Sequence, residues 1–173
     1  VNVSRMCLDP LLTYGAQAMA DIDAERCTYA VEQVILAIIV TTGIASILLT
    51  AEHIVDYNSG LAHAVFYALT AWPHIEACHL HGEVVGFGVL ILLLTDGNLD
   101  GFRQMYAFNR SVGLPTALSQ VEMTDADVKK LVPLVAKMPD IAHNPYTITE
   151  EMLHKAFADL DYYNQHQAFK ENE

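Results

Sequence analysis

Two stretches decide the fold of this 173-residue chain: LAHAVFYALTAWP, residues 61–73, and HGEVVGFGVLILLL, residues 81–94. Neither shows the alternation of apolar and polar residues that marks a half-buried strand. A proline stops the first stretch, so it predicts a helix over residues 61–72. The second predicts a buried helix over residues 82–94, in which Gly86 and Gly88 indicate close backbone approach to a neighbour.

The remaining chain also has helical patterns. Thr124 with Asp127 resembles a capping box, and Thr149 can cap a last helix. Pro133 falls inside the stripe of apolar residues after Thr124 and predicts a kink or an early break. Further helices are predicted over residues 10–22, 24–50 and 100–111. No strand pattern or internal repeat is found, so the predicted fold class is all-α.

One apolar run, residues 34–51, contains eighteen residues without a charge and reaches the length at which membrane helices begin. Its flanks are Glu32 and Glu52, so no Lys or Arg sets an orientation, and it contains several Thr and Ser residues. A helix that is apolar all round is either a membrane span or a core helix. We favour the core helix and expect no membrane partner.

Composition narrows the function classes. The length suits a single domain, residues 1–173. A net charge of −12 argues against nucleic acid and against an anionic membrane surface. Three widely spaced cysteines and the lack of a signal-peptide pattern indicate the cytoplasm. The chain begins with Val1, so we expect a fragment or a trimmed product.

The chain shows no glycine-rich phosphate-binding loop. Gly86-Phe87-Gly88 is its only GxG, and Ile91 stands where a third glycine should be. We therefore expect no nucleotide site in this chain.

Four histidines, residues 63, 74, 79 and 81, fall within nineteen residues. A helix, a proline-stopped loop and a returning helix can bring His63 and His81 together as ligands of one divalent metal. Imidazole suits zinc or iron. A histidine within an apolar helix is also often a hydrogen-bonded core residue, so the spacing leaves both interpretations open.

The stretch from residue 59 to residue 88 resembles the signature of glycerol dehydrogenases, in the iron-containing alcohol dehydrogenase superfamily. The matching residues are His63-Ala64, Leu69-Thr70-Ala71, Pro73 and His81-Gly82-Glu83-Val84-Val85-Gly86-Phe87-Gly88. Weaker matches follow at Val112-Gly113-Leu114-Pro115-Thr116, Leu118 and Gln120, and at Ile141-Ala142-His143-Asn144-Pro145. The resemblance implies a helical bundle like the C-terminal domain of the dehydroquinate synthase-like fold.

The resemblance also implies a metal site and a cofactor. His63 and His81 match the two histidine ligands of a catalytic Zn²⁺ or Fe²⁺. Asp9 in Leu8-Asp9-Pro10-Leu11 partly matches the family's aspartate ligand, although Asp before Pro is also an ordinary helix N-cap. The resemblance implies NAD bound by an N-terminal nucleotide-binding domain that this chain lacks, and a small polyol substrate. We also expect a homo-oligomer, because an apolar face should be exposed where the missing domain would pack.

Four further residues are candidates for the substrate pocket or for contact with the metal ligands. Phe66 and Tyr67 stand where the family usually has His-Asn, so they either make the pocket more apolar or pack in the core. Glu83 either contacts a metal ligand or is a charge in the first helical turn. His143 either lines the cleft or belongs to a loop before the last helix.

The leading hypothesis is an NAD- and metal-dependent polyol dehydrogenase, of the glycerol type, that oxidises a secondary alcohol to a ketone. The isolated chain is expected to be inactive. One alternative is a dehydrogenase for 2-hydroxy acids or another small alcohol. Another is a stand-alone helical interaction module without catalysis.

Overall fold

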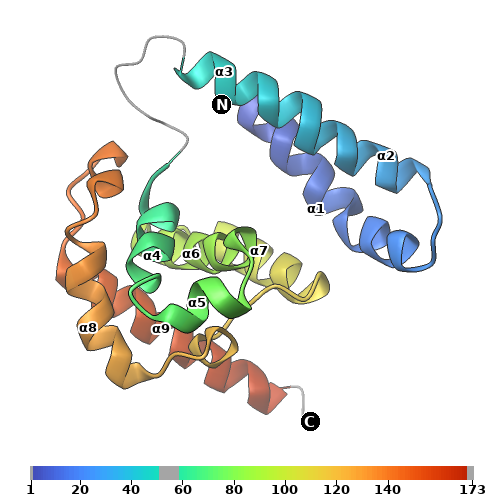
Figure 1. The fold of residues 1–173 in the computed structure, drawn as a ribbon. Helices are drawn as coiled ribbons and strands as arrows, with labels where there is room; N and C mark the ends of the chain where they lie inside the picture. The colour runs from blue at the N-terminus through green and yellow to red at the C-terminus, as the bar shows by residue number, and fades with distance from the viewer. Residues whose placement is uncertain (1, 51–58, 171–173) are drawn as a thin grey trace. The chain divides into compact units, whose positions relative to one another are not determined.

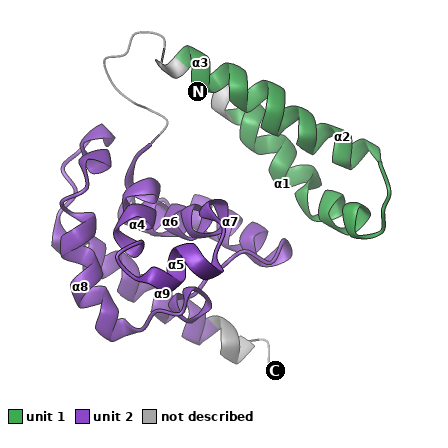
Figure 2. Ribbon diagram, in the orientation of Figure 1, with its two compact units in different colours: residues 1–58 green, residues 59–173 purple. Residues whose placement is uncertain are grey.

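The computed structural model describes the backbone of residues 2–50 and 59–170 and the side chains of residues 5–48 and 59–166 (Figure 1). Helices and their connections make up this described part, and it contains no strand. The all-α prediction is confirmed. The chain separates into two compact units, Val1–Asn58 and Ser59–Glu173 (Figure 2), which we describe one by one. The expected single domain stays a prediction.

Unit 1 is a helical hairpin. Its first arm is α1 (Asn2–Asp23), and its second arm is α2 (Tyr29–Leu36), the π-helical turn η1 (Ala37–Thr41) and α3 (Thr42–Thr50). The prediction that the first helix starts at Pro10 is wrong, because α1 continues through this proline. The second arm begins at Tyr29 and not at residue 24, since Glu25 has a positive φ of 54° that ends the first helix.

A buried carboxylate closes the turn of the hairpin. Asp21 is 2% exposed and accepts hydrogen bonds from Thr28 Oγ1 at 2.7 Å, Arg26 Nη2 at 2.5 Å and Gln17 Nε2 at 2.9 Å. The bond from Thr28, then those from Arg26 and Gln17, lower the pKa of Asp21 from its ordinary value of 3.8 to about 2. Asp21 is therefore ionised at neutral pH and ties both arms together.

The apolar second arm forms a helix, as predicted, and unit 1 by itself buries only part of it. From Tyr29 to Leu48 it has 20 residues and a mean hydropathy of 2.0, long and apolar enough to cross a membrane, and 17% of it is buried. Only one face is covered: Val31, Ala37 and Ala45 are buried, whereas Ile39 and Ile47 are 68% and 71% exposed. The reason is that a two-helix hairpin gives each helix a single partner. Ala51, the last residue of the predicted run, lies outside the described residues.

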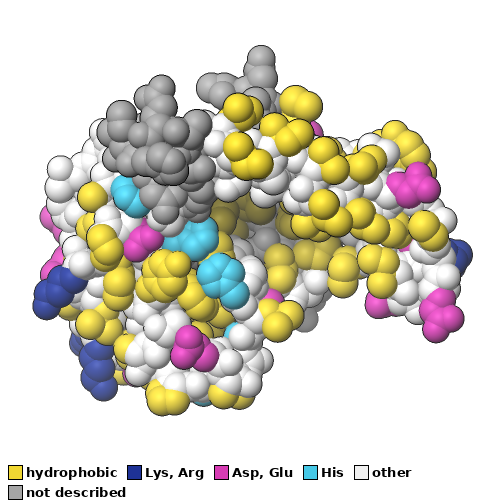
Figure 3. All heavy atoms as spheres, turned by 45° about the horizontal axis from the view of Figure 1, so that its top comes forward, with side chains coloured by type: hydrophobic (Ala, Val, Ile, Leu, Met, Phe, Trp, Pro, Cys, Tyr) yellow, Lys and Arg dark blue, Asp and Glu magenta, His cyan; other side chains and the backbone are white. Residues whose placement is uncertain are grey.

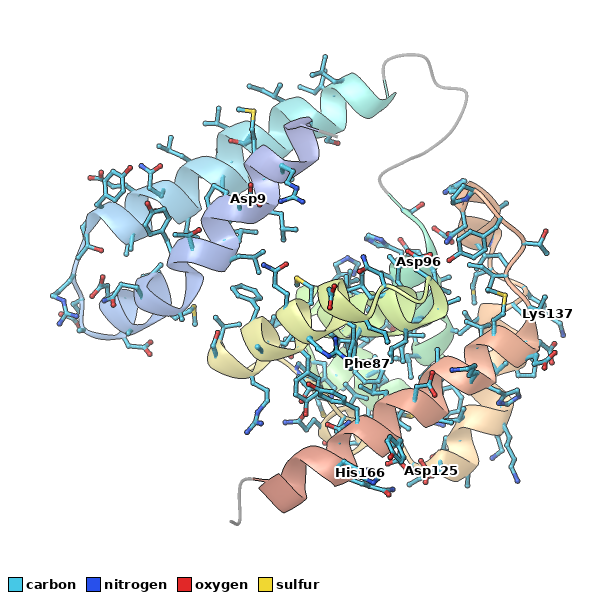
Figure 4. All side chains as sticks on the ribbon, turned by 180° about the vertical axis from the view of Figure 1, so that it is seen from behind. Asp9, Phe87, Asp96, Asp125, Lys137 and His166 are labelled. Carbon is cyan, nitrogen blue, oxygen red and sulfur yellow. The ribbon has the colours of Figure 1, made fainter. Side chains whose placement is uncertain are left out.

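Unit 2 is a bundle built around one central helix. Its elements are α4 (Leu61–Leu69), α5 (Pro73–Cys78), α6 (His81–Thr95), α7 (Leu99–Ser111), η2 (Leu118–Val121), α8 (Asp125–Val135), η3 (Pro139–His143) and α9 (Glu150–Lys170). Helix α6 packs against α4, α7 and α9. Its Phe87, labelled in Figure 4, is fully buried, as are Leu90 and Ile91. The predicted buried helix is thus confirmed, and its burial on several sides explains why it has no polar face.

Two prolines act differently from the prediction. Pro73 follows α4, which ends at Leu69 and not at residue 72, and it also occupies the first position of the short helix α5. A proline fits there because a residue in the first helical turn needs no N–H for an intrahelical hydrogen bond. Helix α8 continues through Pro133 to Val135, so of the two expectations the early break does not occur and the kink stays a prediction.

Two predicted helix starts are confirmed. The Thr124 N–H donates to Asp127 Oδ2 at 3.1 Å at the start of α8. The Met152 N–H donates to Thr149 Oγ1 at 3.3 Å at the start of α9. Both contacts satisfy backbone groups that a helix end leaves free.

Helices α4 and α6 cross in close backbone contact at Gly88. A Cβ atom at this position would lie 2.4 Å from the Ala62 carbonyl oxygen and 3.0 Å from its Cα. At Gly86 the nearest atom, Leu114 Cδ1, would lie 3.5 Å away, which is ordinary contact. The prediction of close approach is therefore confirmed for Gly88, and this approach sets the spacing of the two helices that carry His63 and His81.

Candidate metal centre

The α4–α6 pair brings two histidines together. His63 lies within α4, and His81 is the first residue of α6. Their ring centroids are 5.6 Å apart. Two imidazoles on one zinc or iron ion, each with a nitrogen about 2.0–2.1 Å from the metal, have centroids roughly 5 Å apart. The donor type and the spacing therefore fit two ligands of one divalent ion.

The described residues of unit 2 place no third ligand beside this pair. In the part of the chain that the structure describes, no group of three His, Cys, Asp or Glu side chains could hold a metal. Asp9 belongs to unit 1, on α1 (Figure 4), where its carboxylate is 55% exposed and 3.9 Å from Arg5 Nη1. Because α1 begins at Asn2, Asp9 is not the helix N-cap that the sequence suggested. Its role as a metal ligand stays a prediction.

Aromatic side chains line the histidine pair. The Phe66 ring meets the His81 ring edge to face, with centroids 4.4 Å apart. Tyr67 lies 5.3 Å from Phe66 and 6.3 Å from His63 between centroids, and it is 42% exposed. The Phe66 ring packs against the core and also touches His81, and its place in a substrate pocket stays a prediction. The surroundings of the pair are therefore apolar on the α4 side.

Glu83 contacts the start of α6. Its Oε2 accepts the Leu80 N–H at 3.1 Å and lies 3.6 Å from His79 Nδ1. Glu83 therefore caps the first helical turn, and its relation to a metal ligand stays a prediction. Any effect on His81 passes through the backbone at residue 80.

His143 lies at the end of η3 and contacts Ser59, two residues before the start of α4. Its Nδ1 is 3.0 Å from the Ser59 carbonyl oxygen and 3.3 Å from Ser59 Oγ. This contact holds two segments together that are 84 residues apart in sequence. His143 therefore supports the start of the helix that carries His63, and its place in a substrate cleft stays a prediction.

Sequence reasoning assigned no role to His79 or Ser59, although both contact candidate residues. His79 is 12% exposed, and its Nε2 is buried without a partner among the described residues. The sequence around His79, a loop followed by an apolar helix, did not predict its contact with Glu83. The space-filling view shows histidine side chains gathered on one face, with hydrophobic side chains beside them (Figure 3).

Known relatives cover nearly all of the chain. A glycerol dehydrogenase from Pseudomonas putida is 31% identical over 175 residues, which is 96% of this chain and 44% of that protein. The hydroxycarboxylate dehydrogenase A of Escherichia coli K12 is 28% identical over 165 residues, or 93% of this chain and 44% of the enzyme. The crystal structure of a probable glycerol dehydrogenase from Sinorhizobium meliloti 1021 has a TM-score of 0.79 and 28% identity, with 95% of this chain and 45% of that one covered.

These similarities show that the chain is homologous to the C-terminal part of a class of oxidoreductases. More particularly, its relatives include glycerol dehydrogenases, as the resemblance in the sequence had implied. The chain spans less than half the length of the relatives that it matches. No protein-family model matches it.

Proposed function

We propose that this chain is the metal-carrying helical part of an NAD-dependent polyol dehydrogenase that oxidises a secondary alcohol to a ketone. The observation that carries the proposal is the His63–His81 pair at 5.6 Å, in a chain homologous to glycerol dehydrogenases. NAD would bind to the part of the longer relatives that has no counterpart here.

The residues of this chain would position the ion and the substrate. His63 and His81 would hold a zinc or iron ion, which supplies Lewis acidity toward a substrate hydroxyl. Phe66 and Tyr67 would restrict water and orient the carbon chain of the substrate beside the pair. Because the described part of unit 2 offers two ligands, the isolated chain would bind metal weakly and would be inactive.

The test is NAD reduction with glycerol by the protein carrying an upstream nucleotide-binding part, before and after treatment with a chelator. Activity that the chelator removes and zinc or iron restores is the expected result. His81→Ala should abolish it, because one of two imidazole ligands is lost. Unchanged turnover in this variant would overturn the proposal. Tyr162→Phe is the control and should keep full activity, because Tyr162 lies on α9 and its side chain is 63% exposed.

A second candidate class of substrate, 2-hydroxy acids, is supported by separate observations. Phe66 and Tyr67 make the surroundings of the histidines apolar, and one relative is named hydroxycarboxylate dehydrogenase. A panel of glycerol, small alcohols and 2-hydroxy acids separates the two classes by kcat/KM. Activity on none of these, with folded protein and bound metal, would favour a helical interaction module.

A further inference from the structure

One member of the histidine pair, His81, is the first residue of α6 and is exposed to solvent. The first turn of any helix lacks intrahelical partners for its N–H groups, and helix ends fray. A metal ligand has to stay within a fraction of an ångström of its place, so His81 needs a local constraint that the helix by itself does not give.

Glu83 supplies a constraint on the backbone. Its Oε2 accepts the Leu80 N–H at 3.1 Å, which closes a loop of residues around His81. The Glu83 N–H in turn donates to the Leu80 carbonyl oxygen at 3.0 Å. The negative carboxylate also lies at the positive end of the helix.

His79 lies near the carboxylate of Glu83. Its Nδ1 lies 3.6 Å from Glu83 Oε2, and its side chain is 12% exposed. Its Nε2 is buried and has no partner among the described residues. The hydrogen bond that holds the Glu83 carboxylate is therefore the one from the Leu80 N–H, and the His79 ring lies close to the same oxygen.

Phe66 contacts the side chain of His81. The two rings meet edge to face, with their centroids 4.4 Å apart. We infer that Glu83 is a positioning residue: by capping α6 at Leu80 it keeps the His81 ring against Phe66 and beside His63. The importance of this placement for a metal rests on the proposed function, but the placement itself does not.

The test uses the metal-free 173-residue chain and nuclear magnetic resonance. The readouts are the nuclear Overhauser effect between the Phe66 and His81 rings and the exchange rate of the Leu80 amide. In Glu83→Ala we expect the ring contact to weaken and the amide to exchange roughly two- to thirtyfold faster, the range that a capping hydrogen bond is worth. Glu83→Gln keeps an oxygen acceptor for the amide and should restore most of the contact.

The chain contains a matched control in α8. Asp127 accepts the Thr124 N–H at 3.1 Å, the same distance and the same three-residue spacing as in the Glu83 cap. Asp127→Ala should therefore destabilise a helix start without changing the contact of His81 with Phe66. An unchanged contact in Glu83→Ala, or an equal loss in Asp127→Ala, would overturn the inference.

A zinc titration of the same variants tests the proposed function separately. Zinc binding that is lost in His81→Ala and weakened in Glu83→Ala, but kept in Asp127→Ala, is the expected result. If the His81→Ala chain binds zinc as the unchanged chain does, the proposed function fails, while the metal-free spectra still decide on Glu83.

Discussion

The substitution Gly88→Ala tests whether the backbones of α4 and α6 meet at Gly88, the contact that sets the spacing of the helices carrying the histidine pair. The added Cβ would lie 2.4 Å from the Ala62 carbonyl oxygen, about 1 Å closer than ordinary van der Waals contact. The opposing atoms belong to the backbone, so no side-chain rotation relieves the clash. One helix has to move.

The magnitude follows from two opposed effects. Overpacking costs about 1–3 kcal/mol, and a clash with backbone belongs at the upper end of that range. Alanine in place of glycine within a helix recovers about 1 kcal/mol. We therefore expect the free energy of unfolding to fall by about 2 kcal/mol.

Urea unfolding followed by tryptophan fluorescence is the assay. Trp72 is the only tryptophan in the chain and belongs to unit 2, so its signal reports that unit. Gly86→Ala, on the same helix with its Cβ 3.5 Å from a side-chain atom, is the control and should be neutral or stabilising by up to about 1 kcal/mol. Equal stability of Gly88→Ala and the unchanged chain would refute the reasoning.

Three further predictions concern side chains with specific hydrogen bonds. The pKa of Asp21 is lowered to about 2 chiefly by Thr28, so its contribution to unit 1 should be present above pH 3.8 and lost as the pH falls toward 2; circular dichroism should show that Asp21→Asn removes this decline. Asn109→Ala should destabilise unit 2 by about 1–3 kcal/mol in urea unfolding, because Asn109 is fully buried and donates to two backbone carbonyls. Burial, then the hydrogen bond to Asp96, raises the pKa of Tyr146 to about 12, so its contribution should be present below pH 10 and lost between pH 10 and 12; absorbance titration should show Tyr146→Phe lacking this late step.

Local patterns in the sequence predicted most helices of unit 2. Gly88 and the apolar run around it indicated close packing, and Thr124 and Thr149 indicated two helix starts that the hydrogen bonds confirm. Prolines were less informative, because Pro10 and Pro133 lie inside helices. A proline removes one hydrogen bond and clashes with one carbonyl, and the packing of neighbouring turns can outweigh that cost.

For the histidine pair, too, the sequence predicts one part and the tertiary structure sets the other. The residue types and the resemblance to glycerol dehydrogenases can be identified from the sequence, because a motif is defined by the order of its residues. The 5.6 Å between the His63 and His81 rings depends on the distance between α4 and α6, which the Gly88–Ala62 contact fixes. The contacts of Phe66 and Glu83 depend on that same crossing and on the cap at Leu80.

The sequence by itself therefore determined the all-α class, the helix that carries each histidine and the chemistry those histidines favour, since these follow from composition, periodicity and motif. Only the tertiary structure decided that Glu83 serves the start of α6, that Asp9 lies within a helix, and that the apolar arm of unit 1 is covered on one face. These depend on which helices meet and how closely, and short-range pattern carries no information on distances across the fold.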